Sequence, residues 1–189
     1  MLYNILIGVA AVVVLFLIVV AMQPAAFRTS RTAKMKAPAP AIFPHMNDMR
    51  AWLAWSPWEK VDPTMKRTYE GAAAGPGSVY SWAGNKNIGE GRCTITESRP
   101  HELVRFKLEF FKPFVATNEG EFVLTPEGDQ TVVTWSMAGE KSFMFKAMGL
   151  VMSMDKMCGG QFEKGLADLK AIVETESQQA RGDARLASV

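Results

Sequence analysis

The longest helical pattern in the chain lies near its end, at Phe143–Glu174. Apolar side chains recur there every three or four residues, and most of the lysine and glutamate side chains lie between them. The apolar positions are Met144, Met148, Val151, Cys158, Phe162, Leu166, Leu169 and Val173. The pattern predicts one long amphipathic helix. Its first half is rich in methionine, which fills irregular space, so this half either covers a cavity or belongs to ordinary core.

Between Met65 and Met137 the apolar pattern changes to a period of two, which is typical of strands with one buried face. Short turn segments rich in glycine, proline and asparagine separate the alternating runs, so neighbouring strands are expected to form hairpins. The predicted strands are Met65–Glu70, Ser78–Ala83, Gly91–Ser98, Leu103–Phe111, Phe114–Thr125 and Thr131–Met137. Thr29–Lys36 predicts a further strand, and two short helices are expected between Ala41 and Trp58.

This order of elements predicts an α+β fold. Hairpin connections produce an antiparallel sheet, and a sheet with one apolar face must bury it against another layer. The long helix at Phe143–Glu174 is the only long helix available, so the sequence predicts that it alone covers the sheet. The polar tail, Thr175–Val189, has no apolar period and is expected to be disordered.

Leu2–Met22 is almost wholly apolar and contains no charged residue. About 20 such residues in a helix span a hydrocarbon core of roughly 30 Å. A cleaved signal peptide is the alternative, but no basic residue precedes the run and Ala21–Pro24 is a poor cleavage site. The sequence therefore predicts a single-pass membrane anchor. Four basic residues follow it, at positions 28, 31, 34 and 36, so the positive-inside rule places the rest of the chain in the cytoplasm.

Composition excludes several classes of function. Lys and Arg number 21 against 19 Asp and Glu, so no strong positive field indicates a nucleic-acid partner. Cys93 and Cys158 lie far apart and lack metal-ligand spacing with His45 or His101. We interpret both cysteines as buried apolar residues in a reducing compartment, and predict neither a metal nor a cofactor.

No pair of residues forms an obvious nucleophile and base, so binding is favoured over catalysis. Asp155 falls on the apolar stripe of the long helix, where an unpaired carboxylate would have a raised pKa. Alternatively it lies at the edge of the stripe and pairs with a strand arginine such as Arg67. An enzyme that uses Asp155 or Glu119 as acid or base is the less favoured hypothesis. Asn118 shares a face with Phe122 and is a candidate for orienting a polar ligand group.

Four segments carry a resemblance to a known family: Ala37–Phe43, Trp55–Pro63, Gly91–Pro100 and Phe162–Leu166. Together they resemble the START-like (SRPBCC) superfamily, in particular its polyketide cyclase/dehydrase and lipid-transport group and the bacterial members with an N-terminal membrane anchor. The resemblance covers Thr29–Glu174. It implies a helix-grip fold, in which a curved antiparallel sheet wraps around the C-terminal helix and encloses a hydrophobic cavity. It implies no fixed catalytic residues, because the superfamily places binders, transporters and some enzymes on one scaffold.

The sequence therefore predicts an anchor at residues 2–22, a START-like domain at 29–174 and a tail at 175–189. The predicted function is a module of the bacterial inner membrane that binds or transports a hydrophobic small molecule or lipid. A cyclase/dehydrase- or hydrolase-like enzyme acting in the same cavity is the alternative. The candidate cavity residues are Tyr80, Trp82, Phe106, Phe110, Asn118, Phe122, Trp135, Met137, Met148, Met152 and Asp155.

Overall fold

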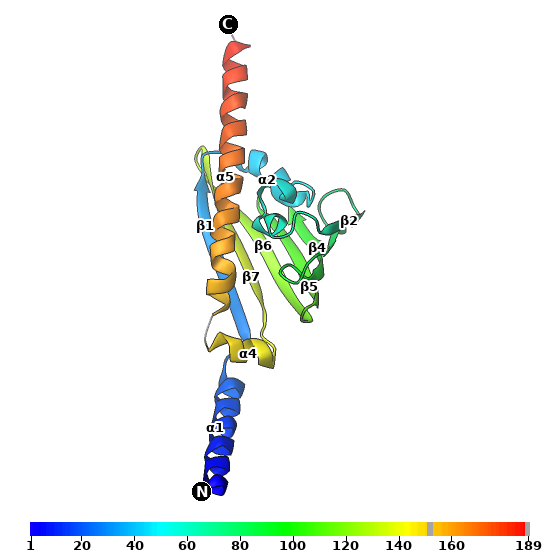
Figure 1. Cartoon of the computed structure of the whole chain (residues 1–189). Helices are drawn as coiled ribbons and strands as arrows, with labels where there is room; N and C mark the ends of the chain where they lie inside the picture. Colours follow the sequence, from blue (N-terminus) through cyan, green and yellow to red (C-terminus); the bar gives the residue numbers. More distant parts are fainter. Residues whose placement is uncertain (151–152, 188–189) are drawn as a thin grey trace.

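The computed structural model describes residues 1–150 and 153–187 and has an α+β helix-grip fold (Figure 1). The order of elements follows the predicted one, except that three short helices stand in place of the predicted two and that the C-terminal helix is divided. The helices are α1 (Leu2–Met22), α2 (Ala39–Asn47), α3 (Trp52–Trp55), the 3-10 helix η1 (Pro57–Lys60), α4 (Phe143–Gly149) and α5 (Met154–Leu186). The strands are β1 (Ala26–Met35), β2 (Lys66–Gly71), β3 (Ser78–Ala83), β4 (Glu90–Arg99), β5 (Leu103–Lys112), β6 (Ala116–Glu127) and β7 (Gln130–Glu140).

The strands form one seven-stranded antiparallel sheet in the order β1-β7-β6-β5-β4-β3-β2. Strands β2 to β7 are joined by hairpins, as the turn segments predict. Strand β1 pairs with β7 from Ala26 opposite Glu140 to Met35 opposite Thr131. Because β1 follows α1 directly, the start of β1 and the end of β7 lie at the end of the domain from which α1 projects (Figure 1).

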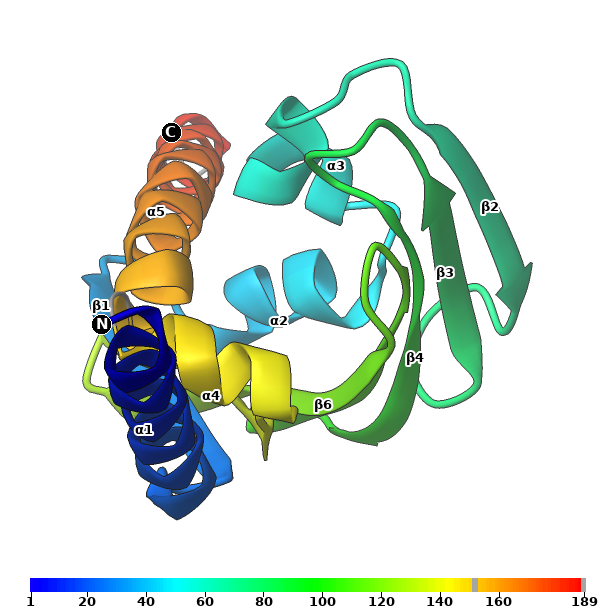
Figure 2. The same cartoon turned by 60° about the horizontal axis from the view of Figure 1, so that its bottom comes forward.

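Several helices cover the concave face of the sheet, whereas the sequence predicts a single one. Helix α5 lies along β1, and α2, α3 and η1 lie on the same side of the curved sheet (Figure 2). The reason is width, because a helix is about 10 Å across and strands lie about 4.8 Å apart. A single helix therefore covers two or three of the seven strands, and the short helices after β1 bury the rest.

The core is built from aromatic rings contributed by these helices and the sheet. Trp55 is fully buried between Phe122 and Trp135, with ring centroids 5.7 and 5.6 Å away. Phe162 of α5 stacks on Trp135 at 4.3 Å, which fixes α5 against the sheet. Trp52 and Trp55 donate their indole N–H groups to backbone carbonyls in α2, at 3.1 and 3.0 Å. A buried tryptophan N–H needs a hydrogen-bond partner, and these two bonds supply it.

The predicted helix at Phe143–Glu174 is two helices, α4 and α5. Gly149 ends α4, and Ser153 caps α5 by accepting a hydrogen bond from the backbone N–H of Lys156 at 3.3 Å. A serine cap satisfies a free N–H at a helix start and favours a new helix there. Val151 and Met152 lie outside the described residues, so the candidate role of Met152 stays a prediction.

The predicted disordered tail is helical up to Leu186, because α5 continues beyond Glu174. Residues such as Glu, Gln, Ala and Arg favour helix, and extending a packed helix requires no new nucleus. Most side chains of this extension are exposed, and it projects from the domain at the end opposite α1 (Figure 1). The tail thus buries few side chains, as its polar composition predicts, but it is helical up to Leu186.

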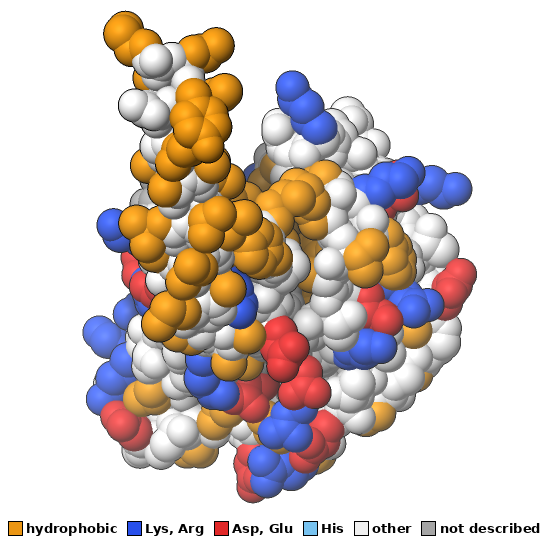
Figure 3. All heavy atoms as spheres, turned by 90° about the horizontal axis from the view of Figure 1, so that it is seen from below, with side chains coloured by type: hydrophobic (Ala, Val, Ile, Leu, Met, Phe, Trp, Pro, Cys, Tyr) orange, Lys and Arg blue, Asp and Glu red, His pale blue; other side chains and the backbone are white. Residues whose placement is uncertain are grey.

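Helix α1 projects from the domain with hydrophobic side chains over its visible face (Figure 3), and its sequence is almost wholly apolar. By length and composition it could cross a membrane, although a signal sequence passes the same test. In α1 only Val20 is buried, and the end of the helix contacts α4. The chain therefore carries one N-terminal apolar helix that fits either a membrane anchor or a signal sequence.

Candidate functional site

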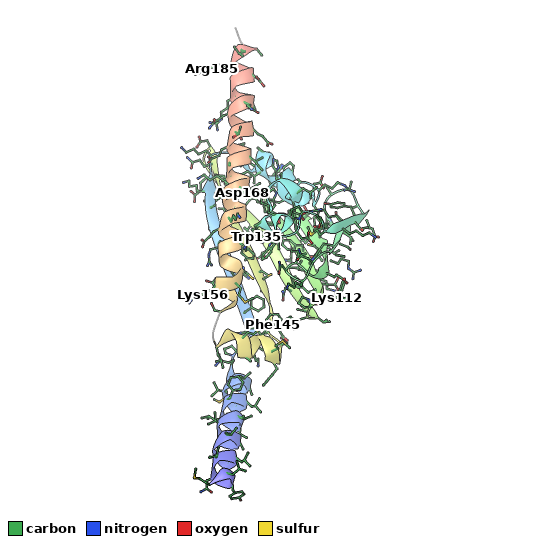
Figure 4. The ribbon with its side chains drawn as sticks, in the orientation of Figure 1. Lys112, Trp135, Phe145, Lys156, Asp168 and Arg185 are labelled. Atoms are coloured by element: carbon green, nitrogen blue, oxygen red, sulfur yellow. The ribbon has the colours of Figure 1, made fainter. Side chains whose placement is uncertain are left out.

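A cavity of about 380 Å³ lies between the concave face of the sheet, the short helices and the helices α4 and α5. Its wall is mostly apolar and includes Trp52, Trp58, Cys93 and Phe162. In Figure 4, Trp135 lies beside the middle of α5, whereas Phe145 on α4 and Lys112 on β5 lie nearer to α1. The cavity therefore runs along α5 towards the end of the domain from which α1 projects.

Eight of the candidate residues predicted from the sequence line this cavity. They are Tyr80, Trp82, Phe106, Phe110, Asn118, Trp135, Met137 and Met148. Phe122 does not line it, because its ring is fully buried in the aromatic core next to Trp55. The alternation of strand residues identifies the correct face of the sheet, but it does not separate wall from core.

Asp155 lies outside the cavity wall. Arg31 of β1 binds both of its carboxylate oxygens, at 2.8 and 2.9 Å, and Arg31 also contacts Glu163 at 2.5 Å. The hydrogen bond from Arg31 holds the pKa of Asp155 below its usual range. The second interpretation made from the sequence therefore fits, with Arg31 in place of Arg67. Glu119 is also outside, on the exposed face of the sheet.

The cavity opens at the end of the domain nearest α1. Its wall there includes Lys112, Pro113 and Phe114, all exposed, in and after the end of β5. On the opposite side it includes Phe145 and the partly exposed Met148 of α4. We call this opening the mouth of the cavity.

A buried polar pair in the cavity wall is not found by sequence reasoning. The Tyr80 hydroxyl donates to Oε1 of Glu59 at 2.5 Å, and Arg67 donates to Oε2 at 2.7 Å. Glu59 is only 8% exposed. Burial raises the pKa of Tyr80 above its usual value, and the hydrogen bond to Glu59 raises it further. The only signal in the sequence is a single acid within the tryptophan-rich segment, and its partners lie on β2 and β3.

Asn118 is the second polar group in the wall. It is 6% exposed, and its Oδ1 has no hydrogen-bond partner in the described part of the protein. Its Nδ2 lies 3.9 Å from the sulfur of Met137, a weak acceptor. A buried amide oxygen without a partner costs free energy, so Asn118 is available to a ligand that carries a hydrogen-bond donor.

Comparison with protein families assigns the fold to a family. A family model described as polyketide cyclase / dehydrase and lipid transport matches residues 26–174, which is most of the chain. The chain belongs to this family. The family is START-like, so the family and the helix-grip fold predicted from the sequence are both confirmed.

Solved structures of similar fold cover most of this family member. Protein CV1439 from Chromobacterium violaceum has 16% identity and a TM-score of 0.56, and the match covers 80% of this chain and 99% of that chain. The Aha1 dimer from Colwellia psychrerythraea has 17% identity and a TM-score of 0.57, with 78% and 96% covered. TTHA0849 from Thermus thermophilus has 16% identity and a TM-score of 0.56, with 80% and 99% covered.

At these identities the likeness establishes the fold and leaves the ligand open. A search of curated proteins found no match to the chain. The function of this polyketide cyclase/dehydrase and lipid transport family member must therefore be argued from its own cavity.

The buried Tyr80 of this family member predicts an alkaline limit to stability. Unfolded tyrosine loses its proton at about pH 10, whereas folded Tyr80, with its raised pKa, keeps it. Stability from this group is therefore complete below about pH 10 and falls by about 1.4 kcal/mol per pH unit above it. Urea unfolding between about pH 9 and 11 measures this slope. In the Tyr80→Phe variant the free energy of unfolding should fall less steeply with pH than in the parent protein, because one proton fewer is released on unfolding.

Cys93 is the matched comparison for this measurement, because burial also raises the pKa of its thiol. An unfolded thiol loses its proton at about pH 8.5, so Cys93 lowers the stability of the parent protein from about that pH upwards. In the Cys93→Ala variant the free energy of unfolding should therefore fall less steeply from about pH 8.5. Equal slopes in the parent protein and in Tyr80→Phe would show that the Tyr80 hydroxyl is not buried as described.

Proposed function

We propose that this protein is a membrane-tethered module that binds a hydrophobic small molecule or lipid in the cavity between the sheet and α5. The observation that carries the proposal is the open apolar cavity of about 380 Å³. Ligand pockets are commonly about 300–1,000 Å³ in volume and mostly apolar, whereas protein cores contain few voids larger than a water molecule. An empty volume of this size in a closed core would cost about 9 kcal/mol, close to the whole stability of a typical domain.

The tether in this proposal is α1. Its length and apolar composition fit a membrane span, and the description of its family includes lipid transport. The four basic residues after the span favour a cytoplasmic location for the domain. A protein fixed to a membrane that exposes an apolar cavity is well placed to handle an apolar compound from that membrane.

The polar groups in the wall suggest which ligands fit. Asn118 offers a buried amide oxygen, so an apolar ligand with one hydroxyl or amide N–H is favoured over a pure hydrocarbon. The Glu59 carboxylate is already held by Tyr80 and Arg67. A charged ligand would have to leave water for a mostly apolar wall, which is costly without a new ionic partner.

A second candidate function is acid–base catalysis in the same cavity. The observation that favours it is the Tyr80–Glu59 pair, because a buried carboxylate hydrogen-bonded to a hydroxyl can accept or relay a proton. Asp155 and Glu119 do not contribute, since both lie away from the cavity wall. Binding is favoured because both oxygens of Glu59 already have partners within the protein.

The test is to identify what the full-length protein retains. The purified, delipidated protein is incubated with a membrane lipid extract, and the bound compounds are identified by mass spectrometry. We expect an intact apolar compound to be retained. A chemically altered compound would support the enzyme, and a protein that retains nothing above a control membrane protein would overturn the proposal.

A cavity-filling variant makes this test specific. Leu108 lines the cavity, so Leu108→Trp should reduce retention by at least about tenfold, or ~1.4 kcal/mol of binding free energy. Its stability should change little, because the ring enters open space. Leu53→Trp is the matched control, since Leu53 is 47% exposed and lies outside the cavity wall.

A further inference from the structure

Exposed apolar side chains outside α1 gather at the mouth of the cavity. Six of them lie on α4 or next to it and in the segment between β5 and β6: Phe114, Val115, Phe143, Met144, Met148 and Leu150. We call these six residues the apolar collar. Val115 is the most exposed of them, at 81%. Large exposed apolar patches on a soluble surface usually mark a binding site for a protein or a membrane.

The collar lies at the end of the domain from which α1 projects. In Figure 3 the hydrophobic surface of α1 continues onto the underside of the domain. Helix α1 contacts α4, and Val20 near the end of α1 is fully buried. The collar is therefore continuous with the helix that is proposed to span the membrane.

The connection between α1 and the domain is short. Only Gln23, Pro24 and Ala25 separate α1 from β1. Three extended residues reach at most about 11 Å, and the polar layer on each side of a bilayer is roughly 5–8 Å thick. If α1 spans the hydrocarbon core, the end of the domain that begins at Ala26 must lie at the depth of the lipid headgroups.

The mouth of the cavity lies inside the collar. The rings of Phe114 and Phe145 meet edge to face, with centroids 5.7 Å apart, and both line the cavity. Phe114 belongs to the segment after β5 and Phe145 to α4, so this contact joins the two sides of the mouth. Lys112, which pairs with Glu90 at 2.9 Å, and the neighbours Glu140 and Lys141 also line this part of the wall, so charged side chains of both signs border the apolar mouth.

We propose that the apolar collar inserts into the membrane interface and holds the mouth of the cavity against the bilayer. The ligand is then a lipid of the same leaflet, which passes between the bilayer and the cavity without crossing water. This inference rests on the proposed function and adds the source of the ligand and its route. The surface of α4 acts as an interfacial helix, with its apolar side chains in the boundary between headgroups and acyl chains.

The first test measures depth in the membrane. The full chain is reconstituted into phosphatidylcholine–phosphatidylglycerol vesicles and carries a nitroxide at Val115→Cys, Met144→Cys or Leu53→Cys. Cys93 and Cys158 are buried, so the label reacts with the introduced cysteine. We expect the labels at 115 and 144 to be relaxed by oxygen dissolved in lipid and shielded from a water-soluble relaxant. The label at 53, which replaces an equally apolar exposed residue on α3, should show the reverse, and water exposure at all three positions would overturn the proposal.

The second test measures uptake. The probe is a single-chain fluorescent lipid in the same vesicles, and the variant carries Val115→Asp and Met144→Asp, two collar residues outside the cavity wall. A carboxylate at the interface opposes insertion, so uptake from vesicles should slow by at least about tenfold. Uptake of the probe from detergent micelles should be unchanged, and Leu53→Asp should behave as the parent protein in both assays.

The outcomes separate the two proposals. Failure of the parent protein to bind the probe from micelles would contradict the proposed function, while the nitroxide depths would still decide whether the collar is inserted. Binding from micelles together with unchanged uptake from vesicles in the Asp variant would leave the proposed function intact and overturn the membrane route.

Discussion

A chain shortened to begin at Gln23 is expected to leave the membrane, whereas the full chain should stay in the membrane fraction after a carbonate wash. Leu2–Met22 contains 14 Leu, Ile, Val and Phe residues and no charge. On insertion scales these residues favour a transmembrane position by about 4–8 kcal/mol in total. The shortened chain keeps every strand and the whole cavity wall, so it should fold and remain in the supernatant.

Three observations accompany this measurement. Weak binding of the shortened chain to vesicles at neutral pH, removed by carbonate, is expected if the apolar collar touches the membrane. Protease added to closed inner-membrane vesicles whose cytoplasmic face is outside should reach the domain if the domain faces the cytoplasm. N-terminal sequencing of the mature protein should find residue 1 or 2, and a start near Ala25 would identify α1 as a signal sequence and contradict the tether.

The strands are largely predictable from the sequence, because the alternation of apolar and polar residues within each strand shows which of its faces is buried. Leu103–Phe111 was predicted and β5 is Leu103–Lys112, while Ser78–Ala83 coincides with β3. Alternation with a period of two is a local property, so no knowledge of the partner strand was needed. The same pattern places seven cavity residues on the correct face, and the eighth, Met148, follows from the helical pattern of Phe143–Glu174.

The predictions that are wrong concern contacts between segments that lie far apart in the sequence. The apolar stripe of Phe143–Glu174 continues past Ser153. Its periodicity therefore gives no sign that Ser153 caps a second helix, α5. Asp155 falls on that stripe, but its environment is decided by Arg31, which is 124 residues away on β1. Glu59 is a cavity residue whose carboxylate is held by Arg67 of β2 and Tyr80 of β3, neither of which is near it in the helical pattern. Periodicity indicates which face of an element is buried, whereas the partner of that face is a tertiary property.

The two ends of the predicted helix are expected to differ sharply in what truncation costs. Leu166→Ala should reduce the free energy of unfolding by about 2–5 kcal/mol, because Leu166 is 1% exposed in the core. Met148→Ala should cost less than about 1 kcal/mol, because Met148 is 38% exposed and borders the mouth, where space already exists. Urea unfolding followed by tryptophan fluorescence measures both values on the full chain in detergent.

Enlarging Met148 sharpens the contrast. In Met148→Trp the ring should enter the mouth with little loss of stability and should reduce uptake of a fluorescent apolar probe from micelles. Leu166→Trp should instead be overpacked and lose about 1–3 kcal/mol or more, since Gly165 beside it already lies against Trp135 and Pro57. Large and equal losses for both alanine variants, with no binding of the probe by the parent protein, would mean that α4 closes a packed core. Unequal losses together with blocked uptake in Met148→Trp are expected only if α4 borders an open cavity.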